Sequence, residues 1–183
     1  MSLVDAVLAT ISAEGIGGLK GRTLLQKKLY FLSVLSQESF NFVPHYYGPY
    51  STSIADTLGA LVSAGIVDEQ KDVYQTTGIF GEYRRYTYKI SRSAKKVSES
   101  RSVQIAPYGD FLKKINNHQI SNDPDLMAVA AKVYLIVAEK KKATKAEIRQ
   151  RAKELNWELD DPKINLVVGY LEHLGLVRSP NNT

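Results

Sequence analysis

The chain of 183 residues contains no cysteine and only three histidines. Without thiols there are no disulfide bonds, no thiolate catalysis and no cysteine-ligated metal. His45, His118 and His173 are far apart in the sequence and follow no ligand spacing, so neither a metal nor another cofactor is expected. Segments long and apolar enough to span a membrane are also missing, as is the basic start of a secretory signal. A cytoplasmic protein without membrane association is therefore expected.

Signatures of catalysis are missing as well. The sequence contains no Gly-x-Ser-x-Gly, His-Glu-x-x-His or Walker pattern. Four glycines between positions 15 and 21 suggest a phosphate loop at first sight, but they follow a predicted helix instead of a strand. They are interpreted as a flexible linker. The sequence thus predicts a protein that is not an enzyme.

Positive charge is in slight excess and evenly spread. The net charge is +5, and residues 1–100 and 101–183 share the excess without a basic tail. A mild positive charge favours polyanionic partners such as nucleic acid. It is also common in proteins that bind none, so charge alone decides nothing about the partner.

A loose internal repeat is the most informative pattern in the chain. The segment from Ile54 to Val67 and the segment from Ile164 to Val177 share five identical residues at a spacing of 110. Each copy predicts a helix, then a glycine suited to a left-handed helix end, Gly65 or Gly175, and then an aliphatic pair. This order is typical of the third helix of a winged helix-turn-helix as it enters the wing. Two such units in tandem are predicted.

The surrounding pattern supports this architecture. Helices are expected over about 2–14, 23–37, 51–64, 107–116, 123–140, 144–155 and 161–175, with a hairpin between 66 and 90. Thr23 and Thr144 each open a predicted capping box, and Asp161 is expected to cap the last helix. The fold class is therefore mainly α with small β-hairpins (α+β). The predicted domains are residues 1–100 and 101–183, with a polar, serine-rich junction from 91 to 105.

Two basic surfaces are candidates for nucleic-acid binding. The hairpin interleaves Lys71, Arg84, Arg85 and Lys89 with tyrosines such as Tyr86 and Tyr88. Such residues neutralise phosphates and stack on bases. A second basic surface surrounds the helix that begins near 144 and contains Lys141, Lys142, Lys145 and Arg149. The ordinary alternative is that the tyrosines cover the core and that both sets of charges face water.

The helices that would read base sequence argue against simple recognition of DNA. Base readout uses mainly Arg, Lys, Asn and Gln. The segment from Ser51 to Ala64 contains none of the four, and the segment from Lys163 to Leu174 offers only Lys163 and Asn165. Either the protein contacts the nucleic-acid backbone through the basic surfaces, or these units bind protein.

A short motif links the second helix to a turn. The helix reads Leu25-Gln26-Lys27-Lys28-Leu29-Tyr30-Phe31, with Lys27 and Lys28 toward its flank, and the turn reads Tyr47-Gly48-Pro49. Gly48 permits a close turn, and Pro49 sets the backbone before the next helix. The motif is therefore either purely architectural or an interaction site, formed by Gln26, Lys27, Tyr30, Tyr47, Gly48 and Pro49.

Over about residues 20–70 this motif resembles a group of small prokaryotic proteins that have a Leu-Gln-Lys-x-x-Tyr-Phe helix and a Tyr-Gly-Pro turn. The group includes the Panacea, or SocA-like, antitoxin domain and uncharacterised winged-helix-like proteins. The resemblance implies a helix-rich, non-enzymatic domain that acts by protein contact in toxin neutralisation or phage-related systems.

Two functions remain open on the sequence. The first is a winged-helix protein that binds nucleic acid in a regulatory role. The second is a protein-interaction module such as an antitoxin or adaptor, with a homodimer as a further expected form of association.

Overall fold

The computed structural model describes residues 2–75, 82–94, 96 and 100–178. Its elements in chain order, with η for short 3-10 helices, are α1 (Leu3–Ser12), η1 (Gly15–Gly17), β1 (Leu19–Lys20), α2 (Arg22–Ser36), α3 (Thr52–Ser63), β2 (Val67–Gln75), β3 (Glu82–Ile90), α5 (Ser102–Ile105), η2 (Ala106–Tyr108), α6 (Gly109–Asn116), η3 (Gln119–Asn122), α7 (Pro124–Lys140), α8 (Lys145–Glu154) and α9 (Asp161–His173). The described chain is mainly helical with one small antiparallel sheet, which confirms the expected α+β class. No helix within the described ranges has the length and apolar character needed to cross a membrane.

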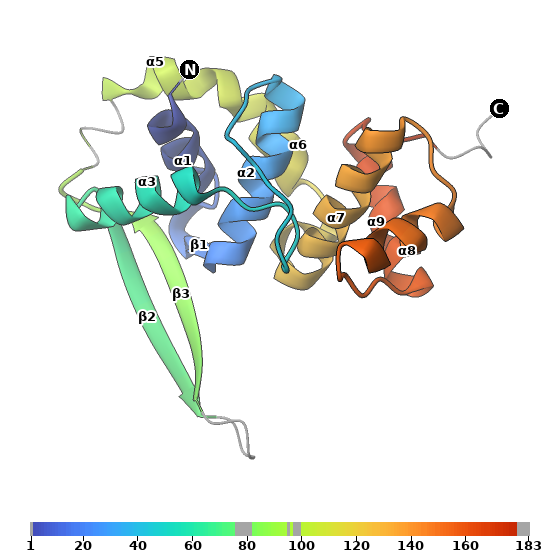
Figure 1. The fold of residues 1–183 in the computed structure, drawn as a ribbon. Helices are drawn as coiled ribbons and strands as arrows, with labels where there is room; N and C mark the ends of the chain where they lie inside the picture. Colours follow the sequence, from blue (N-terminus) through green and yellow to red (C-terminus); the bar gives the residue numbers. More distant parts are fainter. Residues whose placement is uncertain (1, 76–81, 95, 97–99, 179–183) are drawn as a thin grey trace.

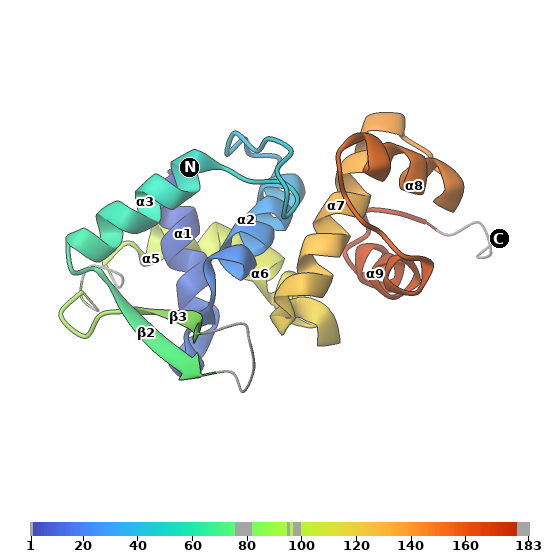
Figure 2. The ribbon, with the colours of Figure 1, turned by 60° about the horizontal axis from the view of Figure 1, so that its bottom comes forward.

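Helix α1 is the centre of the N-terminal half. All its residues from Asp5 to Ile11 are buried, because α2, α3, α6 and strand β3 pack around it. The hairpin of β2 and β3 starts beside α1 and extends far beyond the helices (Figure 1). Helices α7, α8 and α9 gather at the opposite end of the molecule (Figure 2). The hairpin is therefore the most projecting part of the described chain.

The glycine segment before α2 is ordered, so its interpretation as a flexible linker was wrong. It contains η1 and β1, and β1 pairs with β3 to give the sheet order β1-β3-β2. Gly18 has φ +70°, and a Cβ there would lie 2.8 Å from the carbonyl oxygen of Tyr88. Glycine is therefore needed at this position for a close backbone approach rather than for mobility.

Helix α2 begins differently from the prediction. Its N-cap is Gly21, with no side-chain cap, so the capping box predicted at Thr23 is wrong. The backbone N–H of Gly21 donates to the carbonyl oxygen of Tyr86 at 2.8 Å, which extends the pairing of β1 with β3 up to the N-cap of the helix. Sheet pairing thus sets the start of α2. Gln26, which should have closed the box, bonds elsewhere.

The C-terminal helices follow their predicted caps more closely. Asp123 caps α7, and the capping box of Thr144 and Glu147 opens α8 as predicted. The last helix is capped by Asp160 instead of Asp161, because Asp160 accepts the N–H of Lys163 at 2.7 Å. Asp161 is the first residue of the helix, and its carboxylate pairs with Arg149.

The internal repeat is confirmed at the two helix ends. Gly65 and Gly175 have φ +67° and +72°. In each copy the next residue donates its N–H back into the helix, from Ile66 to the carbonyl oxygen of Leu61 at 3.0 Å and from Leu176 to that of Leu171 at 2.9 Å. A strand follows only the first copy among the described residues. That the two copies belong to equivalent larger units stays a prediction.

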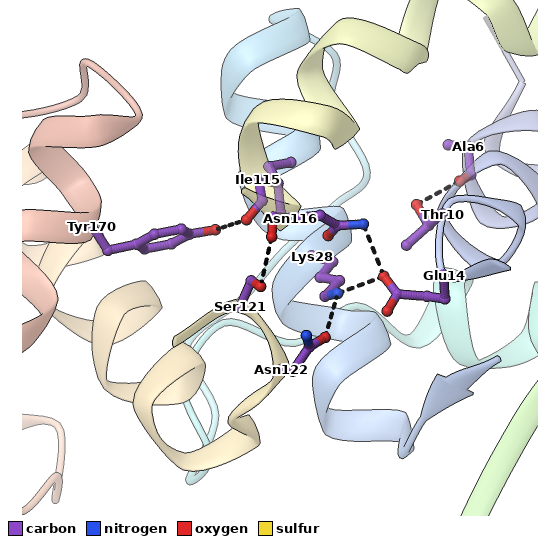
Figure 3. Close-up of polar contacts among 9 residues, drawn as sticks. All are labelled: Ala6, Thr10, Glu14, Lys28, Ile115, Asn116, Ser121, Asn122 and Tyr170. Atoms are coloured by element: carbon purple, nitrogen blue, oxygen red, sulfur yellow. Dashed lines mark hydrogen bonds and ion pairs between the residues drawn. The ribbon is translucent and has the colours of Figure 1, made fainter. Parts of the chain in front are cut away.

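A polar cluster around the buried Lys28 joins the two halves of the chain. Figure 3 shows the ammonium group of Lys28 between the carboxylate of Glu14 and the amide oxygen of Asn122. The side-chain amide of Asn116 also donates to Glu14, at 3.1 Å. The buried apolar residues of both halves form one connected core. The boundary at 100/101 therefore coincides with no break in the core, and independent folding of two domains stays a prediction.

Candidate functional site

The motif of α2 holds the start of α3 through a side chain. The amide nitrogen of Gln26 donates to the carbonyl oxygen of Ser51 at 2.9 Å, and its amide oxygen accepts the N–H of Ser51 at 3.0 Å. Ser51 is the N-cap of α3, and its hydroxyl donates to the carbonyl oxygen of Phe40. Gln26 therefore acts as a buried clamp between two helices that are joined by a long connection.

The Tyr-Gly-Pro turn packs against the C-terminal half. Gly48 has φ +88°, and a Cβ there would lie 3.1 Å from Cγ of Lys132 and 3.3 Å from the carbonyl oxygen of Ala128, both on α7. On the same loop, the carbonyl oxygen of His45 accepts the indole N–H of Trp157 at 2.7 Å. The turn is thus held between α2 and α7, which explains the need for glycine.

A pocket of about 410 Å³ lies between α2, this loop and α3. Its walls are mainly apolar on the side of α3 and polar on the side of α2 and the loop. Its lining includes Arg22, Gln26, Lys27, His45, Tyr47 and Gly59. Concave apolar sites with a few polar groups are typical of binding sites. The structure thus brings four of the predicted motif residues together, since Gln26, Lys27 and Tyr47 line the pocket and Gly48 shapes the loop beside it.

Lys27 is the unusual group of this pocket. The sequence placed it toward the flank of α2, but it is 1% exposed, and its ammonium group donates to the carbonyl oxygen of Pro49 at 2.7 Å. The helix is covered on this side by the loop, which hydrophobic periodicity does not indicate. Burial, together with the smaller effect of the positive charge of Lys132, lowers the pKa of Lys27 to about 7.

Exposed aromatic side chains lie on the loop beside the pocket. Tyr46 and Tyr47 are 67% and 60% exposed, and their rings meet edge to face with centroids 4.9 Å apart. The ring of His45 lies 5.1 Å from that of Tyr50, another lining residue. Large exposed aromatics next to a pocket are typical of recognition surfaces. Tyr46 was missed by the sequence analysis because it falls outside the motif.

Tyr30 is placed by the structure in the core. It is 6% exposed, and its ring contacts those of Phe31, Phe42 and Tyr134. Burial raises the pKa of its hydroxyl. Of the six motif residues, Tyr30 is thus the one whose contacts are plainly those of packing.

The hairpin carries as many acids as bases. Its strands contain Lys71, Arg84, Arg85 and Lys89 together with Asp68, Glu69, Asp72 and Glu82. In the register of the two strands Asp68 lies opposite Lys89, and Asp72 lies opposite Arg85. Lys71 and Lys89 are exposed and Arg85 is half-buried, whereas the side chain of Arg84 and the turn at 77–81 lie outside the described part. The positive charge of this surface is therefore offset locally.

The second basic surface is partly neutralised. Arg149 binds both carboxylate oxygens of Asp161, at 2.8 and 2.7 Å. Lys141, Lys142 and Lys145 are exposed, and within the described ranges none of the three forms an ion pair. Of this predicted surface, three exposed lysines without an ion pair in the described chain thus remain, at the junction of α7 and α8.

Two of the histidines that are far apart in the sequence lie side by side in the structure. The rings of His118 and His173 are 5.5 Å apart, because the end of α9 packs beside η3. Burial lowers the pKa of His118, and the neighbouring His173 adds to the effect. Among the described residues no third acidic or imidazole ligand joins them, so this pair has no complete metal-binding set.

Comparison of the sequence with models of known protein families and with curated proteins found no match.

Proposed function

We propose that this chain is a non-enzymatic protein-interaction module built from winged-helix-like units, and that a partner protein inserts an apolar side chain into the pocket between α2 and α3. The architecture supports the first part. A helix, a short strand, two helices and a hairpin follow one another with the sheet order β1-β3-β2, as expected for a winged helix. The observation that carries the second part is the pocket of about 410 Å³ beside exposed Tyr46 and Tyr47.

The surface chemistry favours a protein partner over nucleic acid. On the outer face of α3 the exposed residues are small or acidic: Thr52, Asp56, Gly59, Ala60 and Ser63. Such a face lets another backbone approach closely and contains none of the side chains that read bases. The hairpin adds no net charge that would bind a phosphate backbone. Tyrosine, in contrast, is enriched at the centres of protein interfaces.

Filling the pocket tests this proposal. Gly59 lies in α3 with helical backbone, lines the pocket, and has no atom within 4 Å of a Cβ built onto it. Gly59→Leu should therefore occupy the pocket without strain and favour the helix by about 0.8–1 kcal/mol. Gly169→Leu is the matched control, since Gly169 is the equivalent residue of the repeat and is equally open in α9.

The measurement is selection of random peptides displayed on phage against the wild-type protein, followed by titration of the enriched peptides. We expect at least one enriched family to bind Gly59→Leu about tenfold or more weakly, and to bind Gly169→Leu as it binds the wild type. Enriched peptides that bind all three proteins equally would contradict the assignment of this pocket.

Nucleic-acid binding is the second candidate, and the free lysines of the α7–α8 junction favour it. Lys141, Lys142 and Lys145 are exposed and unpaired within the described part of the chain. If they contact duplex DNA, replacing all three with Glu should reduce the slope of log affinity against log salt by roughly 0.9 for each lost phosphate contact. An unchanged slope in a gel-shift titration would remove this surface from any interface.

A further inference from the structure

Two adjacent lysines of α2 are buried, but only one of them has a carboxylate partner. Lys28 is 0% exposed and pairs with Glu14, with Asn122 as a second acceptor. Lys27 is 1% exposed, and within the described chain its single hydrogen-bond acceptor is the carbonyl oxygen of Pro49. An ammonium group can donate three hydrogen bonds. Lys27 is therefore the buried cation that lacks a counter-charge.

The surroundings of Lys27 strengthen the need for an anion. The positive charge of Lys132, on α7, repels it. The acid that lines the same pocket, Glu69, is bound at 3.1 Å by the guanidinium group of Arg22. A buried charge without an opposite charge is costly, whereas a charge-assisted hydrogen bond to a carboxylate is among the stronger polar contacts. The pocket thus lacks one negative group on its polar wall.

We propose that the partner segment bound in this pocket presents a carboxylate beside its apolar side chain, and that the carboxylate pairs with the ammonium group of Lys27. This inference rests on the proposed protein-interaction function and specifies its partner. The apolar side chain lies against Leu58 and Val62 of α3, and the carboxylate lies toward α2 and the loop. Both a Glu or Asp side chain and a free C-terminus of the partner supply this chemistry.

Proton uptake on binding follows from the state of Lys27. Burial lowers its pKa to about 7, so at pH 8 the free protein holds most of this amine neutral. A carboxylate favours the protonated form, so binding at pH 8 must take up a proton. Because the pKa of Lys27 in the free protein is about 7, the affinity for a segment with a carboxylate should fall about tenfold between pH 6 and pH 8. His45 also lines the pocket, so His45→Gln serves as the control that should keep the dependence.

The peptides selected in the preceding experiment provide the test. We expect those that distinguish the wild type from Gly59→Leu to carry Asp, Glu or a free C-terminus within two positions of a large apolar residue. Neutralising that group, by Glu→Gln, Asp→Asn or C-terminal amidation, should weaken binding at least about tenfold. The two kinds of neutralisation also identify which source supplies the carboxylate.

Isothermal titration in two buffers of different ionisation enthalpy measures the proton uptake. The wild type should take up close to one proton at pH 8 with the acidic peptide and none with its neutral counterpart. Lys27→Met should lose both the uptake and the pH dependence. If this variant does not fold, the pair of acidic and neutral peptides on the wild type answers the same question.

The outcomes separate the two proposals. If no peptide depends on Gly59, the proposed function fails, and this inference fails with it. If Gly59-dependent peptides bind equally well with and without their carboxylate, the inference alone is overturned. Octanoate serves as a small-molecule competitor. If octanoate displaces the acidic peptide at octanoate concentrations below the Kd of that peptide, the occupant of the pocket is a small carboxylic acid, and the role of a partner segment is overturned.

Discussion

Replacing Gln26 with methionine should destabilise the protein far more than its conservative shape suggests. Gln26 is 4% exposed, and its amide makes both hydrogen bonds to the backbone of Ser51. Methionine retains almost the same length and volume but has no strong donor or acceptor. The substitution therefore removes the clamp between α2 and α3 while the apolar packing of the side chain is preserved.

The expected loss follows from the backbone groups of Ser51 that Gln26 leaves behind. The N–H and the carbonyl oxygen of Ser51 are buried, since this residue is 0% exposed. A buried donor or acceptor without a partner costs about 1–3 kcal/mol. The N–H loses its partner, whereas the carbonyl oxygen keeps the N–H of Ala55 at 3.4 Å. The free energy of unfolding should therefore fall by about 1–3 kcal/mol, which for a chain of this length corresponds to a fall in Tm of roughly 2–12 °C.

Urea titration followed by circular dichroism measures this loss, and amide hydrogen exchange localises it. Exchange at the N–H of Ser51 should accelerate more than exchange in α8 and α9, because the clamp acts at the start of α3. Gln150→Met is the matched control, since Gln150 is exposed on α8, and its effect should stay within about 0.5 kcal/mol. If the two variants lost equal stability, the clamp would have no energetic role.

Two further predictions concern the same region. Gly48→Ala should destabilise the protein by about 1–3 kcal/mol in a thermal melt, because φ is +88° and the added Cβ would press on Lys132 and Ala128. The control is Gly109→Ala, at an open position with helical backbone, which should be neutral or stabilising in the same melt. The second prediction uses pH. Burial lowers the Lys27 pKa from 10.5 to about 7, so the unfolded chain binds more protons between these values, and the free energy of unfolding should rise with pH in this window by at most about 1.4 kcal/mol per unit. Urea titrations from pH 7 to pH 9 check this rise; a fall in stability, or an equal rise in Lys27→Met, would refute it.

Local structure was largely determined by the sequence, because its causes lie within a few residues of one another. The capping box at Thr144, the cap at Asp123 and the glycines that end α3 and α9 were all predicted correctly from short patterns. A cap depends on one side chain and the amides two or three positions ahead. Short patterns gave the wrong helix start where pairing with a distant segment sets it. Pairing of β1 with β3 starts α2 at Arg22 and leaves Thr23 without its predicted role.

The sequence predicted residues of the candidate site but not that they lie together around one pocket. The motif named Gln26, Lys27, Tyr47, Gly48 and Pro49 from short-range features and from a family resemblance. That four of these residues form or shape one pocket with α3, and that the carbonyl oxygen of Pro49 receives the ammonium group of Lys27, depends on the path of the long connection between α2 and α3. Tyr46 and Lys132 belong to the same surroundings and carried no signal in the sequence.

Tertiary structure alone decided which charged groups are buried and what they face. Lys27 and Lys28 are neighbours of the same type on one helix, yet Glu14 neutralises one and no carboxylate of the described chain reaches the other. In the same way, His118 and His173 are 55 positions apart and meet only because α9 packs beside η3. Burial and charge pairing depend on which distant segments share a volume, whereas helical periodicity and caps depend on near neighbours. The sequence therefore determined the elements of this protein, and packing between distant elements determined its pocket and the unpaired charge beside it.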